Sequence, residues 1–347
     1  MSKLRKILYP FSFLYGEIVG IRNKAYEKKI LKSTSFDFPI IVVGNLNVGG
    51  TGKSPQIEYL IRLLKDYYKI AVLSRGYKRK SKGFQIADEN STAENIGDEP
   101  LQFHKKFKDI IVAVEADRVR ALKELQCLSS PPDVVLLDDA FQHLKVNPGF
   151  TILLTSYKNL YVDDVMLPTG DLREKKEGAK RANIIVVTKC PEYLTSQQQF
   201  EIAKKLEPEL FQTVFFSTIS YDIKVFGTGG EIAVNDLKDF KVLLVTGIAN
   251  CAPLVDFLES KNIDFKHLRF ADHHFFTNSD KEKIKNELEA LDGNKKIILT
   301  TEKDYVRTFS ENNNQTYYLP IRTKFIENGD DFDKIILNYV RQNTRNS

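Results

Sequence analysis

A run of apolar residues that leads into a glycine-rich turn is the feature that most restricts how this chain can fold. Ile40–Val43 are four consecutive β-branched residues, and after a short polar stretch come three glycines within Gly49–Gly52, followed by Lys53 and Ser54. Glycines let successive backbone N–H groups turn around phosphate oxygens, and the N-terminus of a following helix favours negative charge. The pattern predicts a phosphate-binding loop between a buried strand and a helix.

The residues of this loop suit a nucleoside triphosphate. Lys53 would reach the β- and γ-phosphates, and the Ser54 hydroxyl would bind Mg²⁺. Asn47 stands where the G-x-x-x-x-G-K-[ST] pattern has its first glycine, but asparagine tolerates left-handed backbone better than most residues. The predicted nucleotide-binding residues are Asn47, Val48, Gly49, Gly50, Thr51, Gly52, Lys53 and Ser54.

Two carboxylates follow a second buried run. Asp138 and Asp139 come directly after Val134–Leu137, and the carboxyl ends of parallel strands form the ligand-binding edge of a sheet. Either carboxylate would hold Mg²⁺, directly or through water. Alone, such a pair is more often a turn or a helix cap, but the phosphate loop upstream favours the metal role. ATP is expected rather than GTP, because Thr188–Pro191 lacks the aspartate that reads guanine.

Alternating apolar runs and helical patterns predict the fold class, an α/β protein with a doubly wound, mostly parallel sheet of the P-loop NTPase type. We expect a P-loop domain over residues 36–220, a smaller α/β domain over 221–316, and a return of 317–347 to the first domain. No apolar run reaches the roughly 18 to 20 residues of a membrane-spanning helix. The predicted strands of the first domain are Ile40–Val43, Ile70–Leu73, Ile110–Val114, Val134–Leu137, Thr151–Leu154 and Ile184–Thr188.

Positive charge is concentrated at the amino terminus. Residues 1–35 hold eight basic and two acidic side chains, a net charge of +6, so the other 312 residues carry −1 of the total of +5. Phe11, Leu14, Ile18 and Ile21 recur at helical spacing, which predicts a basic amphipathic helix suited to a membrane interface. The alternative is a helix packed on its own domain with its lysines facing water. The nearly neutral remainder argues against a nucleic-acid partner.

Taken together, the motifs of this chain resemble those of the tetraacyldisaccharide 4′-kinases, the lipid A 4′-kinases of Gram-negative bacteria. They occur in the family's order and differ from it in small ways: Ala140 stands where glycine is frequent, and Asp171 where an apolar residue is common. The matching segments are Val43–Asn45, Val48–Pro55, Leu73–Tyr77, Gly97–Pro100, Leu137–His143, Leu167–Glu174, Asp272-His273 and Thr301–Asp304.

The resemblance implies a reaction and a location. The chain would transfer the γ-phosphoryl group of ATP, with Mg²⁺, to the 4′-hydroxyl of a lipid A disaccharide 1-phosphate. The family also implies a two-strand hinge between the domains and a membrane-associated N-terminal helix. The expected location is therefore the cytoplasmic face of the inner membrane, with the protein held peripherally on anionic lipids.

The resemblance also assigns catalytic roles, and most of them have a structural alternative. Asp98 matches the family's general base, and His273 matches a histidine that assists it. Arg118 and Arg173 match positions near the phosphates, and Glu174 would support Mg²⁺. From the residues alone, Asp98 would equally cap a helix, a histidine pair is more often a surface feature, and Arg173-Glu174 would form part of a salt-bridged loop.

One different class of function is compatible with the phosphate loop. A soluble P-loop ATPase or GTPase that acts as a switch or metal chaperone would use residues 1–35 to dock a protein partner. Val48 occupies the place of the early-loop lysine that such dimeric switch ATPases carry. That difference, together with the missing guanine-reading aspartate, favours the kinase.

Overall fold

The chain divides into two units. Unit 1 comprises residues up to Ile219 together with those from Thr323 onward, and unit 2 runs from Ser220 to Arg322. This computed structural model describes residue 5 and residues 7–248, 250–272, 274, 276–309 and 315–344. The segment 317–347 is thus shared between the units, since only its part from Thr323 onward belongs to unit 1.

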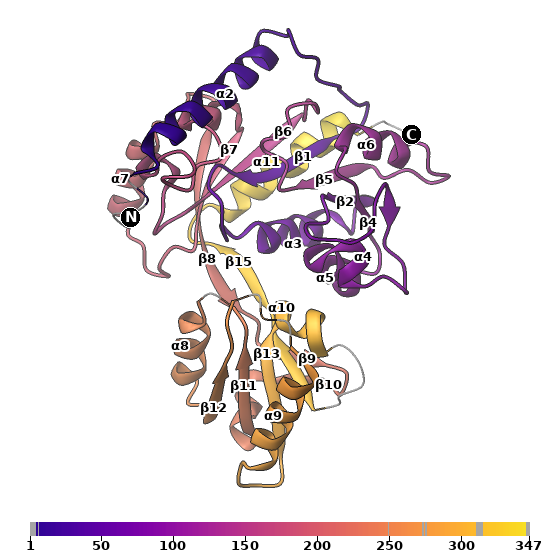
Figure 1. The fold of residues 1–347 in the computed structure, drawn as a ribbon, viewed down its shortest axis with the longest axis vertical. Helices are drawn as coiled ribbons and strands as arrows, with labels where there is room; N and C mark the ends of the chain where they lie inside the picture. The colour runs from indigo at the N-terminus through magenta and orange to yellow at the C-terminus, as the bar shows by residue number, and fades with distance from the viewer. Residues whose placement is uncertain are drawn as a thin grey trace. The chain divides into compact units, whose positions relative to one another are not determined.

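Within the described residues, unit 1 is built on a nine-stranded sheet in the order β15-β8-β7-β6-β1-β5-β2-β4-β3 (Figure 1). Neighbouring strands from β8 to β4 run parallel, and the short β3 pairs antiparallel with β4. This confirms the predicted doubly wound, mostly parallel sheet. The strands are β1 Ile40–Asn45, β2 Ile70–Ser74, β3 Gln85–Ile86, β4 Ile111–Val114, β5 Val134–Asp138, β6 Phe150–Ser156, β7 Ile184–Thr188, β8 Thr213–Tyr221 and β15 Ile321–Phe325.

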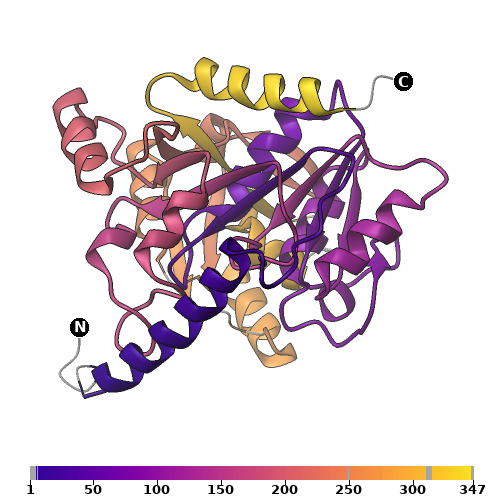
Figure 2. The same cartoon turned by 90° about the horizontal axis from the view of Figure 1, so that it is seen from above.

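Helices cover both faces of this sheet because its central strands are apolar on both sides. Every residue of β1, β2 and β5 is buried. On one face the core joins these strands to α3 and α11, and Figure 2 shows α11 running along the sheet; on the other face it joins them to α6. The helices of unit 1 are α2 Tyr9–Glu27, α3 Lys53–Leu64, α4 Ala93–Ile96, α5 Asp98–Lys106, α6 Arg118–Gln126, α7 Ser196–Leu206 and α11 Gly329–Asn343, with short 3₁₀ turns η1 Tyr161–Asp163 and η2 Lys176–Arg181.

Unit 2 has its own sheet and core. In its described part the strand order is β10-β9-β14-β13-β11-β12, parallel from β14 to β12 and antiparallel at β9 and β10. Its elements are β9 Lys224–Gly227, β10 Gly230–Ala233, η3 Val234–Asp239, β11 Lys241–Thr246, α8 Ala252–Ser260, β12 Phe265–Arg269, α9 Asn278–Glu289, β13 Lys296–Thr301, α10 Glu302–Asp304, η4 Tyr305–Phe309 and β14 Thr316–Leu319. No helix among the described residues is long and apolar enough to cross a membrane.

Candidate active site

The glycine-rich loop connects β1 to α3 and has the backbone that its glycines permit. Gly49 and Gly52 have φ angles of +109° and +87°, a region that side chains with a Cβ rarely adopt. Within the loop, the Thr51 N–H donates to the Gly49 carbonyl at 3.1 Å. Lys53 and Ser54 are the first two residues of α3. The loop therefore places a helix N-terminus, a lysine and a hydroxyl at the end of a buried strand.

Two other segments hold this loop in place. From the end of β7, the Thr188 hydroxyl donates to the Thr51 carbonyl at 2.7 Å, and Lys189 Nζ donates to the Gly50 carbonyl at 2.6 Å. On the other side, the Val48 N–H donates to the Asp171 carbonyl at 2.7 Å. The sequence analysis missed Lys189, although a polar residue directly after a buried strand was the same signal that identified Asp138.

The side chain of Asn47 connects the loop to another segment of unit 1. It is buried, and its Nδ2 donates to Asp164 Oδ2 at 2.7 Å. The amide thus anchors the loop to the segment that follows η1. This contact accounts for a side chain at the position where the phosphate-loop pattern has glycine.

The carboxylates after β5 lie close to the lysine of the loop. Lys53 Nζ is 3.7 Å from Asp139 Oδ1 and 3.4 Å from Asn45 Oδ1. Asp138 is buried and accepts one hydrogen bond of 3.0 Å from the Ser74 hydroxyl. Burial, and next the negative charge of Asp139, raise the pKa of Asp138 to about 6. Asp138 is therefore a buried carboxylate beside a second carboxylate, and a divalent cation would relieve the repulsion between them.

Both predicted arginines contact this pair. Arg173 Nη1 donates to Asp139 Oδ1 at 2.9 Å. Arg118 is buried at the start of α6, and its Nη2 lies 3.4 Å from the Asp138 carbonyl oxygen. Burial lowers the pKa of Arg118 to about 10, partly offset by the charge of Asp138. The Arg118 Nε has no hydrogen-bond partner among the described residues, so the guanidinium retains a donor.

Glu174 differs from what its predicted metal role requires. It is fully buried, and Arg181 Nη2 lies 2.9 Å from each of its carboxylate oxygens. Asn23 of α2 donates to one oxygen at 2.6 Å, and Gln142 donates to the other at 3.0 Å. Each oxygen is therefore already occupied by protein donors. The contacts of Glu174 are those of a buried ion pair, and its support of Mg²⁺ stays a prediction.

Asp98 is the first residue of α5. The N-cap position before it is occupied by Gly97, with a φ of +97°. A Cβ on Gly97 would lie 3.3 Å from the Gly76 Cα, so the start of α5 packs closely on the turn after β2. The next residue, Glu99, is near enough to Asp138 to raise its pKa. Glu99, which the sequence analysis did not single out, therefore contributes to the electrostatics of the carboxylate pair.

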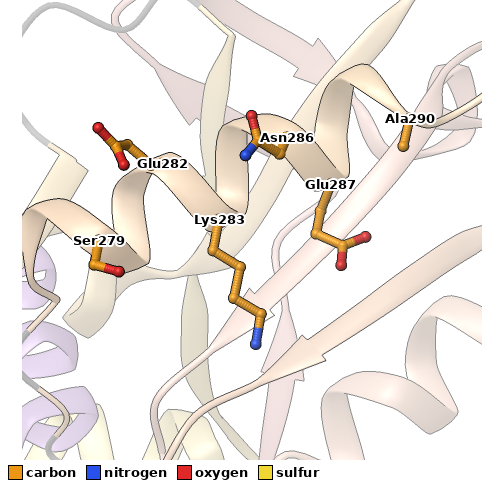
Figure 3. A pocket seen from close by; sticks show the side chains of 6 residues that line it. All are labelled: Ser279, Glu282, Lys283, Asn286, Glu287 and Ala290. Atoms are coloured by element: carbon orange, nitrogen blue, oxygen red, sulfur yellow. The ribbon is translucent and has the colours of Figure 1, made fainter.

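The remaining predicted site residue cannot be placed. His273 lies outside the described residues, so its expected partnership with Asp98 stays a prediction. In unit 2, the surface cavity of Figure 3 is lined by six residues from α9 and its end and includes no predicted site residue. A second cavity, of about 450 Å³, lies in unit 1 and is lined by Arg75, Gly76, Tyr77, Lys78, Arg79, Ser81, Lys82, Gly83, Glu115 and Ala116.

The N-terminal helix α2 packs on unit 1 through small and polar residues. Ser12, Gly16 and Val19 are buried, and the Ser12 hydroxyl donates to Thr169 Oγ1 at 2.7 Å. Glu17 pairs with Lys175 at 2.7 Å. The large apolar residues of the helix point away: the exposed side chains include Phe11, Phe13, Leu14, Ile18 and Ile21. The helix therefore packs on its own unit, along which Figures 1 and 2 show it lying, and leaves large apolar side chains exposed. Its association with a membrane stays a prediction.

Comparison with known proteins places this geometry in a family. Residues 4–341 match the family model described as tetraacyldisaccharide-1-P 4′-kinase (LpxK). The chain is 53% identical to the tetraacyldisaccharide 4′-kinase of Flavobacterium johnsoniae over 99% of both chains, and 43% identical to that of Bacteroides thetaiotaomicron over 99% of this chain and 96% of the other. It also resembles the crystal structure of LpxK from Aquifex aeolicus in complex with ATP, with a TM-score of 0.77 and 31% identity over 97% of this chain and 99% of that one.

Proposed function

The chain belongs to the tetraacyldisaccharide-1-P 4′-kinase family and is an ATP-dependent kinase of lipid A biosynthesis, and on this basis we propose how its residues carry out the transfer. The loop of residues 47–54 binds the triphosphate of ATP. Lys53 lies against the γ-phosphoryl group, and Arg118 and Arg173 neutralise the charge that spreads over its oxygens during transfer. The contacts of all three with Asp138 or Asp139 support this assignment.

The residues around Asp138 fit a magnesium ion. Mg²⁺ prefers oxygen ligands, usually one or two carboxylates together with phosphate and water. Asp138, Asp139 and the Ser54 hydroxyl offer such ligands, and the repulsion between the two carboxylates, which contributes to the raised pKa of Asp138, supports a site that a cation would stabilise. When bound, the ion neutralises charge on the β- and γ-phosphate oxygens. Glu174 is left out of this set because Arg181, Asn23 and Gln142 occupy its oxygens.

Asp98 is proposed as the base that accepts the proton of the 4′-hydroxyl as that oxygen attacks phosphorus. A sugar hydroxyl is a poor nucleophile near neutral pH, and a positioned carboxylate contributes on the order of 10²-fold or more. The observation that carries the assignment is the place of α5: it begins at Gly97, which packs on Gly76 in the wall of the basic cavity around Tyr77. That cavity would receive the anionic sugar head group.

The test is the Asp98→Ala variant, assayed with ATP, Mg²⁺ and a lipid A disaccharide 1-phosphate. We expect kcat to fall by about 10²-fold or more, while ATP affinity and melting temperature stay at the parent values. Equal losses of turnover, ATP binding and stability would instead identify Asp98 as a structural residue. His273, proposed to assist the base on the resemblance alone, is tested by the double variant Asp98→Ala/His273→Ala, which should be little worse than the poorer single variant.

The exposed face of α2 is proposed to insert into the membrane interface at the cytoplasmic face of the inner membrane. Anionic lipids would attract the basic residues beside it, with about 1 kcal/mol for each. Leu14→Glu/Ile18→Glu should reduce sedimentation with anionic vesicles and leave ATP binding unchanged. Phe200→Glu is the matched control, since Phe200 is an equally exposed apolar residue on another helix, α7. Unchanged sedimentation of the α2 variant would contradict this part of the proposal.

A further inference from the structure

A carboxylate inside α3 connects the helix of the phosphate loop to the helix that carries Asp98. Glu58 is only 1% exposed. Its Oε2 is 2.7 Å from Lys106 Nζ of α5 and 2.9 Å from Arg62 Nη2 of α3, and its Oε1 accepts from Gln102 Nε2 of α5 at 2.9 Å. One buried carboxylate thus binds α5 at two points, one helical turn apart.

The same two helices meet again one turn further along. The Arg62 guanidinium, itself paired with Glu58, lies 5.2 Å from the ring centroid of Phe107, the residue that follows α5. Figure 1 shows α3 and α5 as neighbours beside the large sheet. These contacts hold the second half of α5 and the residue after it, from Gln102 to Phe107, and each of them is made by Glu58 or by its partner Arg62.

The points at which Glu58 holds α5 lie on the stripe that begins with Asp98. Residues four apart on a helix project from nearly the same side, so Asp98, Gln102 and Lys106 share one stripe. Gln102 is about 6 Å along the axis from Asp98, and Glu58 is about 7 Å along α3 from Lys53. By fixing Gln102 and Lys106, Glu58 sets both the rotation of α5 about its axis and its distance from the phosphate loop.

Stability alone gives a weak reason for such an arrangement. Removing two charges from water costs about as much as their attraction returns, and apolar residues of similar volume often serve equally well in this respect. What a buried ion pair provides is a unique alignment, because a shift or rotation of one helix would leave a buried charge without its partner. Gln102 adds a directional hydrogen bond that an apolar contact lacks.

We propose that Glu58 is a positioning residue for the phosphoryl transfer: it fixes the rotation and register of α5 against α3, and so aims the Asp98 carboxylate at the acceptor hydroxyl. This inference rests on the proposed role of Asp98 as the base. Glu58 contacts neither ATP nor the acceptor and acts only through α5. Its loss should therefore lower kcat and leave the binding of ATP by the loop unchanged.

The experiment compares Glu58→Gln, which removes the charge, with Glu58→Met/Lys106→Met, which replaces the ion pair by apolar side chains. For Glu58→Gln we expect kcat to fall about tenfold or more, the scale of a small misplacement of a reacting group, with the KM for ATP within about twofold of the parent. The Met/Met variant should regain most of the melting temperature that Glu58→Gln loses, but kcat should stay low. Glu209→Gln, which breaks the exposed pair with Lys180, controls for loss of a charge and should change neither quantity.

A double-mutant cycle separates this inference from the proposed function. In the Asp98→Ala background, Glu58→Gln should cause no further loss of kcat, because the group that it positions is absent. A further loss as large as in the parent, or recovery of kcat together with melting temperature in the Met/Met variant, would overturn the positioning role while leaving Asp98 as the base. Full turnover by Asp98→Ala alone would overturn the proposed base, and the inference with it.

Discussion

Asp138, at the end of β5, and Glu174 belong to the same unit, yet the protein surrounds their buried carboxylates in different ways. Burial, and next the negative charge of Asp139, raise the pKa of Asp138 to about 6, although the Ser74 hydroxyl that donates to it acts in the opposite direction. Glu174 is enclosed by Arg181 and two amide donors. A buried carboxylate is a better candidate metal ligand when fewer of its oxygens are held by protein donors. The sequence presents both as acids near a phosphate loop, and only their partners distinguish them.

The largest effect is expected from removing Lys53, the cation that lies 3.7 Å from Asp139. Lys53→Ala should lower kcat by about 10³-fold, since charge stabilisation at a transferring group is worth roughly 10²- to 10³-fold per donor. The melting temperature should change little, because Lys53 lies at the edge of the core and not within it. Turnover and thermal unfolding of the variant measure this, with Lys65→Ala, at the opposite end of α3, as the control. Near-normal turnover at saturating ATP would reject the loop as the phosphate site.

The difference between Asp138 and Glu174 is tested by replacing each carboxylate with the amide of the same shape. Asp138→Asn should raise the Mg²⁺ concentration needed for half-maximal turnover by about tenfold or more, the usual scale for the loss of metal-site interactions, while the protein remains as stable as the parent. Glu174→Gln should instead lower the stability of the protein and leave its Mg²⁺ requirement unchanged. The substitution leaves the Arg181 charge without its partner, which costs about 3 kcal/mol for a buried pair. If Glu174→Gln shifts the Mg²⁺ requirement as Asp138→Asn does, the two sites are alike and the comparison fails.

The smallest effect concerns the pH dependence of stability. Because the pKa of Asp138 is raised to about 6, the folded protein holds this proton more tightly than the unfolded chain does. This contribution favours folding below about pH 4 and is lost as the pH rises through about 6. In metal-free protein, the free energy of unfolding of Asp138→Asn should therefore gain on that of the parent between pH 4 and 6, by at most about 3 kcal/mol. Denaturant unfolding at several pH values measures the difference, and parallel curves for the two proteins would contradict the raised pKa.

Much of the fold was predictable because its strands are nearly continuous apolar runs. All six strands predicted for the first domain occur, including β1 and β5, which carry the phosphate loop and the carboxylate pair. The order of the strands was not predictable, since it depends on which buried faces pack together. For example, β14 lies in the sheet of unit 2, whereas β15 lies beside β8 in the sheet of unit 1. The sequence could not predict this separation, because the two strands are adjacent in the chain and similar in pattern.

For the N-terminal segment, the sequence pattern predicted the helix but not the face through which it packs. The apolar spacing predicted a helix, and α2 is one. Which face would pack was not evident, because burial of large apolar residues is the usual expectation. Instead, Ser12 and Gly16 allow the helix to approach the segment that contains Thr169, and the larger residues remain exposed.

The sequence by itself determined the features that depend on neighbouring residues: a buried strand, a turn that only glycine adopts easily, and a lysine and hydroxyl at the start of a helix. These are local, because backbone geometry and hydrophobic periodicity act over a few residues. The tertiary structure alone decided the partners of the charged groups. Glu174 meets Asn23 from 151 positions away, and Glu58 meets Gln102 from 44 positions away. Electrostatic and hydrogen-bond contacts act over a few ångströms in space, and only the packing of distant elements determines which charges come within that range.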